Sequence, residues 1–289
     1  MTTLLVASAQ PRVGRSLIAA ALAYRAARDG RPMTLARLEG DESAAPDAAT
    51  FASLEHLRSP GVPVAAADIK RLDGDAIVEA PAGSAAALAS DLGARVLAIA
   101  DAAGEAIDAA GPQMAGTIIT NVALSDMEST AKGEGVIAVL AEDRVLAAPS
   151  GVEIGQALKA NWLRRGDGAP GIERVMIGTV ASDAASPYFG GRERKCVITR
   201  YDKTDIQLAA LLTDVELLVL TGGGAPSPYL LDRVEGTRDD LSVLVTDADT
   251  PDAMRMIEEL YAHSRFDGQT KLDRAVAMLD EAGVDLFPA

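Results

Sequence analysis

The stretch Leu4–Ser16, which reads LLVASAQPRVGRS, carries the strongest fold signal in the chain. Its apolar run, Leu4–Ala7, has the length and composition of a buried strand. The polar segment that follows leads into an Ala- and Leu-rich run with the spacing of a helix. A strand, a loop containing Gly14 and a helix, in this order, are typical of phosphate-binding loops. The first turn of a helix offers phosphate both unpaired N–H groups and the positive end of the dipole.

The loop departs from the usual phosphate-binding pattern at three positions. Arg15 stands where the pattern has lysine, Ser8 stands where an opening glycine is expected, and Pro11 removes one backbone N–H. Arginine pairs with phosphate, but its planar guanidinium does not replace the point charge of lysine freely. These residues leave three possibilities open. The loop binds a nucleotide and catalyses its turnover, it binds a nucleotide without turnover, or it is a strand-to-helix turn with nothing bound.

The composition indicates a globular protein of about two domains, with 289 residues, 48% of them hydrophobic and 24% charged. The single Cys196 excludes an intramolecular disulfide and an all-cysteine metal site, and the presence of only two histidines disfavours a histidine-rich site. No segment has the ~18 uncharged apolar residues of a membrane span, and the N-terminus lacks a secretory pattern. We therefore expect a soluble, cytoplasmic protein.

The charge balance restricts the class of partner. The formal net charge is −15 and the isoelectric point is about 4.6. Binding to the phosphate backbone of nucleic acid, or to anionic lipid, requires a basic surface. We expect neither nucleic acid nor membrane as a partner, and a small molecule as the ligand.

The first half of the chain alternates strands with helices joined by short loops. After the first strand, further strands are expected at Met33–Leu38, Asp75–Glu79, Arg95–Ala100, Gly116–Thr120 and Val136–Leu140, with a short helix at 104–110 among the connections. This alternation predicts a parallel sheet covered on both faces.

Polar residues at the expected strand ends are candidates for a site, because ligands of parallel sheets lie beyond the carboxyl ends of the strands. Glu79 either holds Mg²⁺ beside a phosphate or is an exposed strand-end acid. Asn121 either contacts a nucleobase or caps the following turn. Asp41 and Asp47 either belong to a solvated loop or face a metal or substrate, and Asp47 also suits a helix N-cap.

The second half of the chain begins a new α/β unit after a linker at 164–171, which is charged and rich in glycine and proline. A helix over 152–163 is expected before this linker. The buried strand at 216–220 ends in Thr221-Gly222-Gly223-Gly224. The amides of that turn either cradle an anion or form a tight junction where only glycine fits.

Two family resemblances cover most of the chain. Residues 1–165 resemble the dethiobiotin-synthetase-like P-loop domain at the N-terminus of long phosphotransacetylases, through the loop Ser8–Ser16, the acid turn Glu79–Gly83, Thr120-Asn121 and the segment 136–150. Residues 172–265 resemble the DRTGG domain, whose motif appears here as Asp202-Lys203-Thr204-Asp205 followed by Thr221-Gly222-Gly223. The fold expected is therefore α/β, with a parallel-sheet P-loop NTPase-like domain at 1–165 and a smaller DRTGG-like domain with a C-terminal helix at 172–289.

The resemblances also imply roles for individual residues. Mg²⁺ is expected on Ser16 and Glu79, with ATP or another nucleotide as the cofactor. The nucleotide-binding residues expected are Gln10, Val13, Gly14, Arg15, Ser16, Asn121, Thr221, Gly222 and Gly223.

The function we expect is that of a homodimeric regulatory or sensor protein that binds a nucleotide or an anionic metabolite. It would be related to the N-terminal regulatory region of phosphotransacetylase, with an enzyme of acyl metabolism as a possible partner and no ATPase or acyltransferase activity of its own. The alternative is an ATP-dependent carboxylate ligase of the dethiobiotin synthetase type, for which Arg37 is the basic group in register. A structural module with both glycine turns empty is the third possibility.

Overall fold

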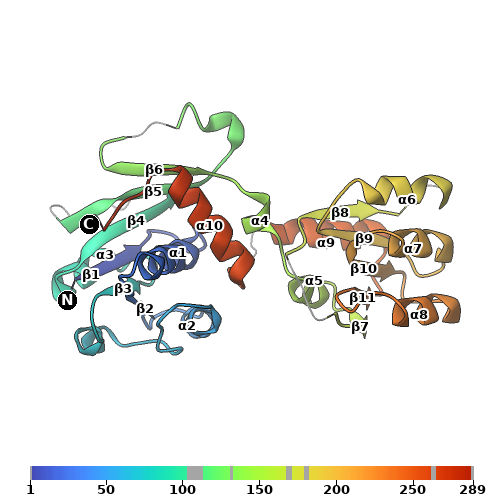
Figure 1. The fold of residues 1–289 in the computed structure, drawn as a ribbon, viewed down its shortest axis with the longest axis horizontal. Coiled ribbons are helices and arrows are strands. Elements are labelled where there is room, and N and C mark those ends of the chain that lie inside the picture. Colours follow the sequence, from blue (N-terminus) through green and yellow to red (C-terminus); the bar gives the residue numbers. More distant parts are fainter. Residues whose placement is uncertain are drawn as a thin grey trace. The chain divides into compact units, whose positions relative to one another are not determined.

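The computed structural model describes residues 2–102, 113–130, 133–166, 171–178, 182–261 and 265–287 (Figure 1). The chain divides into two compact units. The first unit comprises residues 1–146 and 266–289, and the second comprises residues 147–265. The helix expected at 104–110 lies outside the described residues.

The first unit is built on a six-stranded sheet in the order β2-β3-β1-β4-β5-β6. Every neighbouring pair in it is parallel, which confirms the parallel sheet expected from the alternating pattern. The strands are β1 (Thr3–Ala7), β2 (Thr34–Arg37), β3 (Ala76–Glu79), β4 (Arg95–Asp101), β5 (Met114–Val122) and β6 (Val136–Ala141).

The apolar run that opens the sequence becomes β1, in the middle of this sheet. Leu4 and Val6 join the hydrophobic cluster on one face, and Leu5 and Ala7 join the cluster on the other. All four are at most 1% exposed. A continuous apolar run is the pattern of a parallel strand that is buried on both faces, and this burial accounts for the central place of β1.

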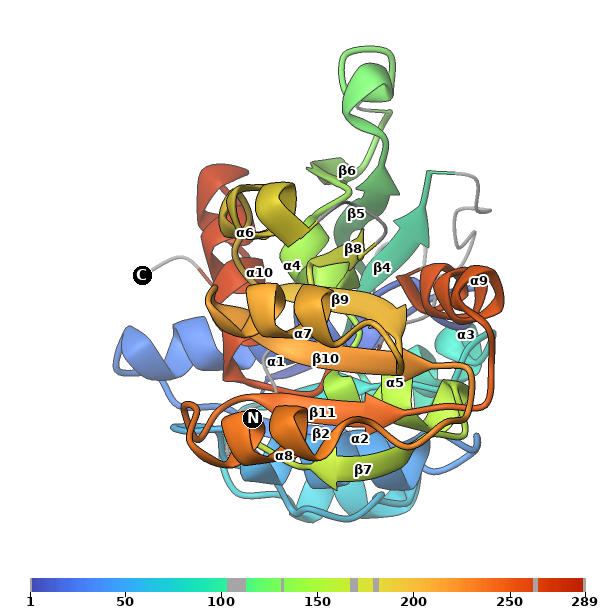
Figure 2. The ribbon, with the colours of Figure 1, turned by 90° about the vertical axis from the view of Figure 1, so that its right-hand side faces the viewer.

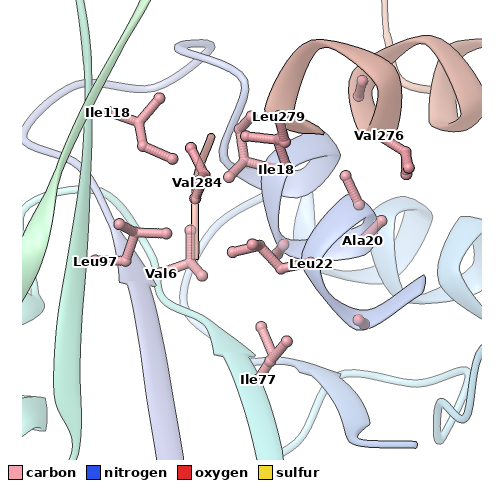
Figure 3. Close-up of a cluster of buried hydrophobic side chains, with 14 of the residues drawn as sticks. Val6, Ile18, Ala20, Leu22, Ile77, Leu97, Ile118, Val276, Leu279 and Val284 are labelled. Atoms are coloured by element: carbon pink, nitrogen blue, oxygen red, sulfur yellow. The ribbon is translucent and has the colours of Figure 1, made fainter. Parts of the chain in front are cut away.

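Helices cover both faces of the first sheet. The first face packs against α1 (Arg15–Arg28), α10 (Gln269–Glu281) and Phe51 of α2 (Ala44–Ser53). Figure 3 shows Leu22 of α1 pointing toward Val6 of β1, and Ile18 lying beside Leu279 and Val284. The opposite face packs against α3 (Ala85–Leu92) and the 3₁₀ helix η1 (Ala66–Arg71). A second 3₁₀ turn, η3 (Leu124–Asp126), follows β5, and α4 (Arg144–Ala147) follows β6.

The C-terminal helix α10 packs with the first unit, whereas the sequence placed it with the second domain. Leu272, Val276 and Leu279 lie in the same buried cluster as residues of α1. Figure 1 shows α10 beside α1, and Figure 3 shows Leu279 beside Ile18. Arg274 Nε donates to Asp143 Oδ2 at 2.8 Å. The local sequence specifies only that α10 has an apolar face, and two different sheets in the chain offer a partner for such a face.

The second unit has a five-stranded sheet in the order β7-β11-β10-β9-β8 (Figure 2). Its strands are β7 (Asn161–Arg164), β8 (Arg174–Ile177), β9 (Lys195–Arg200), β10 (Val215–Thr221) and β11 (Ser242–Val245). The four strands β8 to β11 are parallel, and β7 runs antiparallel to β11 at the edge.

The edge strand β7 replaces the second half of the helix expected at 152–163. The helix α5 (Gly151–Ala157) is shorter and begins with a capping box between Ser150 and Glu153. The chain then reverses through Lys159, which has a positive φ of 48°. The residues after it are paired with β11, so this part of the expected boundary region lies within the second sheet.

The second sheet is also covered on both faces. The helices α6 (Ser182–Gly190), α7 (Thr204–Leu211) and α8 (Pro228–Glu235) pack on one face. The helices α5 and α9 (Thr250–Tyr261) pack on the other. Of the helices that the structure describes, none combines the length and the apolar character that crossing a bilayer requires.

Candidate functional site

Strand pairing in the first unit brings the carboxyl ends of β1, β2 and β3 together. Glu79 is the register partner of Val6 in β1 and of Arg37 in β2. Side chains alternate between the faces of a strand. Because Leu35 and Ile77 lie on the α1 face, Arg37 and Glu79, two residues further on, lie on that face too. The fold therefore places two oppositely charged side chains next to the start of α1.

The loop between β1 and α1 has the backbone of an anion-binding turn. Gly14 is the N-cap of α1 with a φ of 87°, and Arg12 has a φ of 63°. Within the described part of the chain, the amides of residues 12–16 donate to no protein acceptor. Successive free N–H groups at the start of a helix form a nest that suits negative charge.

Three contacts fix the shape of this loop. Ser8 Oγ donates to the Gln10 carbonyl at 2.5 Å, and the Ser8 carbonyl accepts from the Gly83 amide at 2.8 Å. Thr120 Oγ1 donates to the Val13 carbonyl at 2.9 Å. Thr120 was part of the resemblance but not of the expected site. Val13 is 2% exposed and packs in the core, while Gln10 is exposed. Val13 is thus an anchor whose amide, rather than its side chain, is available.

Arg15, the first residue of α1, is buried beside the loop. Its guanidinium Nη1 donates to the Ala80 carbonyl, and Nε lies 3.8 Å from Glu79 Oε1. Burial lowers the pKa of Arg15, and the charge of Glu79 opposes this shift. The guanidinium therefore has one carboxylate and one carbonyl to compensate it.

Glu79 is buried at the centre of the site, with 1% of its side chain exposed. Oε1 accepts from Ser16 Oγ at 2.9 Å. Oε2 accepts no hydrogen bond from any residue that the structure describes, and it lies 3.5 Å from Arg37 Nε. Burial raises the pKa of Glu79 to about 7, although Arg37 and Arg15 both lower it. A shift of this direction and size is common at functional sites.

Arg37 is fully buried and is held by two further acids. Its Nη2 donates to both carboxylate oxygens of Asp41, at 2.5 and 2.6 Å, and its Nε lies 3.4 Å from Asp47 Oδ2. Burial lowers the pKa of Arg37, but Glu79 and Asp41 together raise it above its ordinary value. Asp41 and Asp47 thus face an arginine, an arrangement that was not among the sequence-based alternatives. The alternation of Leu35 with Arg37 and of Ile77 with Glu79 is the sequence signal that points to it.

The expected magnesium ligands Ser16 and Glu79 lie together, but their surroundings do not fit a divalent cation. Each oxygen of Glu79 faces a guanidinium nitrogen within 4 Å. Among the residues that the structure describes, no three metal-binding side chains gather around a common point. Mg²⁺ prefers several oxygen ligands and carries a charge that two arginines would repel.

Asn121 lies near the carboxyl end of β5, directly after Thr120, and its side chain is exposed. Its φ of 55° is the left-handed conformation that asparagine tolerates better than most residues. Thr120 connects this strand end to the loop through Val13. The structure thus places Asn121 on the strand end that supports the loop.

In the second unit, the amides of Gly222 and Gly223 are already used within the protein. Gly222 N donates to the Ala248 carbonyl at 2.9 Å, and Gly223 N donates to the Thr246 carbonyl at 3.0 Å. Thr221 Oγ1 lies 2.8 Å from Thr250 Oγ1. The φ values of 90° and 68° at the two glycines agree with a tight junction between β10 and the loop after β11. Neither of these two amides therefore has a free N–H to donate to an anion.

Comparison with known families concerns mainly the second unit. Residues 153–260 match the sequence model of the DRTGG domain, in agreement with the motif seen in the sequence. These residues account for nearly all of the second compact unit.

Among solved structures, the chain is similar to the CBS and DRTGG domains of the regulatory region of Clostridium perfringens pyrophosphatase, complexed with the activator diadenosine tetraphosphate. The identity is 19% and the TM-score 0.36, over 48% of this chain and 63% of that chain. A likeness this low carries no argument about ligands.

Proposed function

We propose that the chain is a regulatory protein that binds a nucleotide, or another phosphate-bearing metabolite, in the loop between β1 and α1. The observation that carries this proposal is the set of amides at residues 12–16, which lie at the start of α1 and have no acceptor among the residues that the structure describes. An anion there would meet free N–H groups and the positive end of the helix dipole. Arg15 and Ser16 belong to the same turn.

The fold of the first unit supports its assignment as a dethiobiotin-synthetase-like P-loop domain. A parallel sheet with β1 in its interior, followed by the loop and α1, is the arrangement that this family implies. In the long phosphotransacetylases, which carry this domain before a DRTGG domain, the region is regulatory. The DRTGG domain at 153–260 is the reason for preferring a regulatory role here. A homodimer and a partner enzyme of acyl metabolism belong to the same proposal.

Arg37 argues against the ligase alternative. A ligase would need a free basic group at the end of β2 to hold the carboxylate of its substrate. Arg37 is fully buried and already faces Asp41, Asp47 and Glu79. A substrate carboxylate would have to displace protein carboxylates that are already in place, so we propose binding without ligation.

Isothermal titration calorimetry with ATP, ADP, GTP, AMP and pyrophosphate, each with and without Mg²⁺, tests the proposal. We expect at least one phosphate-bearing ligand to bind with a dissociation constant below about 1 mM, which is a binding free energy of about −4 kcal/mol. Absence of binding by all of them would contradict the proposal. Phosphate release that depends on a carboxylate substrate and is lost in Glu79→Ala would favour the ligase instead.

A further inference from the structure

The arrangement around Glu79 bears on how the proposed ligand is bound, and this inference rests on the proposed function. In phosphate-binding loops, a Ser or Thr at the start of the helix and an acid on a neighbouring strand hold Mg²⁺ beside the phosphates. Ser16 and Glu79 occupy these two places. Here they contact each other directly, at 2.9 Å between Ser16 Oγ and Glu79 Oε1.

Two guanidinium groups flank the carboxylate. Arg15 Nε lies 3.8 Å from Oε1, and Arg37 Nε lies 3.5 Å from Oε2. All three side chains are at most 6% exposed. A divalent cation bound to either oxygen would lie close to both guanidinium groups, in surroundings where solvent screens the repulsion weakly.

The two nearby acids, Asp41 and Asp47, both contact Arg37. Asp41 contacts Arg37 through both carboxylate oxygens, and Asp47 lies 3.4 Å from Arg37 Nε. With these acids turned toward Arg37, Glu79 lacks the further carboxylate oxygens that would compensate a divalent cation.

We propose that Glu79, whose two oxygens already face Arg15 and Arg37, holds no divalent cation, so that the loop binds a metal-free polyphosphate. The ligand class is a nucleoside di- or triphosphate, or pyrophosphate, without a coordinated divalent cation. The loop amides and the positive end of the α1 dipole hold its oxygens, while Arg15 stays paired with Glu79 in the first turn of α1. Glu79 then acts as a positioning residue that keeps Arg15 at the loop.

Calorimetry on the full chain tests this inference, with ADP as the probe and either EDTA or excess Mg²⁺ in the buffer. We expect a dissociation constant in EDTA that is no larger than the constant in Mg²⁺. A constant about tenfold larger in EDTA, equivalent to about 1.4 kcal/mol, would overturn the inference while leaving the proposed function intact. Failure to bind ADP, pyrophosphate or any other nucleotide in both buffers would remove the proposed function itself.

Glu79→Gln separates the two roles of Glu79, and Asp41→Asn is the matched control on the other side of Arg37. If Glu79 positions Arg15, Glu79→Gln leaves binding independent of Mg²⁺ and changes the affinity in both buffers by the same factor. If Glu79 is a metal ligand, the variant loses affinity only in Mg²⁺, which would contradict the inference. Should Glu79→Gln fail to fold, the comparison of buffers on the unmodified chain still decides the question.

Discussion

Arg15 and Glu79 face each other inside the first unit, with Arg15 Nε 3.8 Å from Glu79 Oε1 and with exposed fractions of only 6% and 1%. Ser16 donates to the same oxygen, and Arg37 approaches the other. The first turn of α1 is therefore joined to the ends of β2 and β3 through one carboxylate. We therefore expect changes at Glu79 to affect both stability and the proposed ligand binding.

Replacing Glu79 by alanine should destabilise the first unit by about 3–5 kcal/mol, because it leaves two buried guanidinium groups without their shared counter-charge. Urea denaturation followed by circular dichroism measures this loss. Asp68→Ala is the control, since it breaks the exposed pair between Asp68 and Arg71 and should cost less than about 1 kcal/mol. Equal losses of stability in the two variants would contradict the prediction, because the buried contacts of Glu79 would then contribute no more than the exposed pair of Asp68 and Arg71.

Stability should also depend on pH through Glu79. Burial raises its pKa to about 7 in the folded chain, above the ordinary value of 4.5. Between these values the folded state binds more protons than the unfolded state, so this contribution is fully present below pH 4.5 and is lost as the pH rises through 7. The total contribution of this one group is on the order of 3 kcal/mol.

The comparison of the unmodified chain with Glu79→Gln isolates that contribution. The free energy of unfolding of the unmodified chain, relative to that of the variant, should fall as the pH rises from 5 to 8. Most of the interval between the two pKa values of Glu79 lies in this pH range. A difference that stays constant would show that Glu79 titrates near its ordinary value, and one that grows with pH would show that folding lowers its pKa; either result contradicts the prediction.

Gly14→Ala tests the loop backbone. An added Cβ at Gly14 meets no atom within 4 Å, so the cost arises from the φ of 87° alone, roughly 1 kcal/mol. Gly30, beyond the other end of α1, has a φ of 76° and equally open surroundings, which makes Gly30→Ala the matched control. Thermal melting should show similar destabilisation in both variants, whereas calorimetry should show weaker ADP binding only in Gly14→Ala. Equal affinities would indicate that the loop does not hold the ligand.

Leu279→Ala tests the packing of α10 on the first unit. Leu279 is fully buried among residues of α1 and the first sheet (Figure 3), so its truncation should cost about 2–5 kcal/mol. Hydrogen exchange should show lost protection in α1 and β1. Ile257→Ala, a fully buried control in α9, should instead expose β9 and β10. If Leu279→Ala instead reduced the protection of the second sheet, the packing of α10 on the first sheet would be contradicted.

The sequence predicts the strand–loop–helix start and the parallel sheet because β1 is a continuous apolar run and the spacing of α1 is regular. The DRTGG domain follows from its motif residues. Side chains alternate between the two faces along β2 and β3. Once the register is known, this alternation predicts that Arg37 and Glu79 lie next to each other.

Other features depend on tertiary contacts that local patterns do not contain. The helix α10 packs on the first sheet, although its apolar face alone does not specify which of the two sheets it contacts. The strand β7 gains its stability from pairing with β11, since Asn161–Arg164 alone has no strand periodicity. The amides of Gly222 and Gly223 are satisfied by carbonyls about 25 residues away in the chain, so their availability to an anion could not be judged from the turn itself.

The most direct test of the anion-binding loop is to follow its backbone amides by ¹H–¹⁵N NMR during titration with ADP and with pyrophosphate. We predict that the amide signals of Val13, Gly14, Arg15 and Ser16 shift to low field with a common dissociation constant, because these N–H groups gain acceptors. Unchanged signals from these four amides at millimolar ligand, or shifts confined to the second unit, would contradict the account.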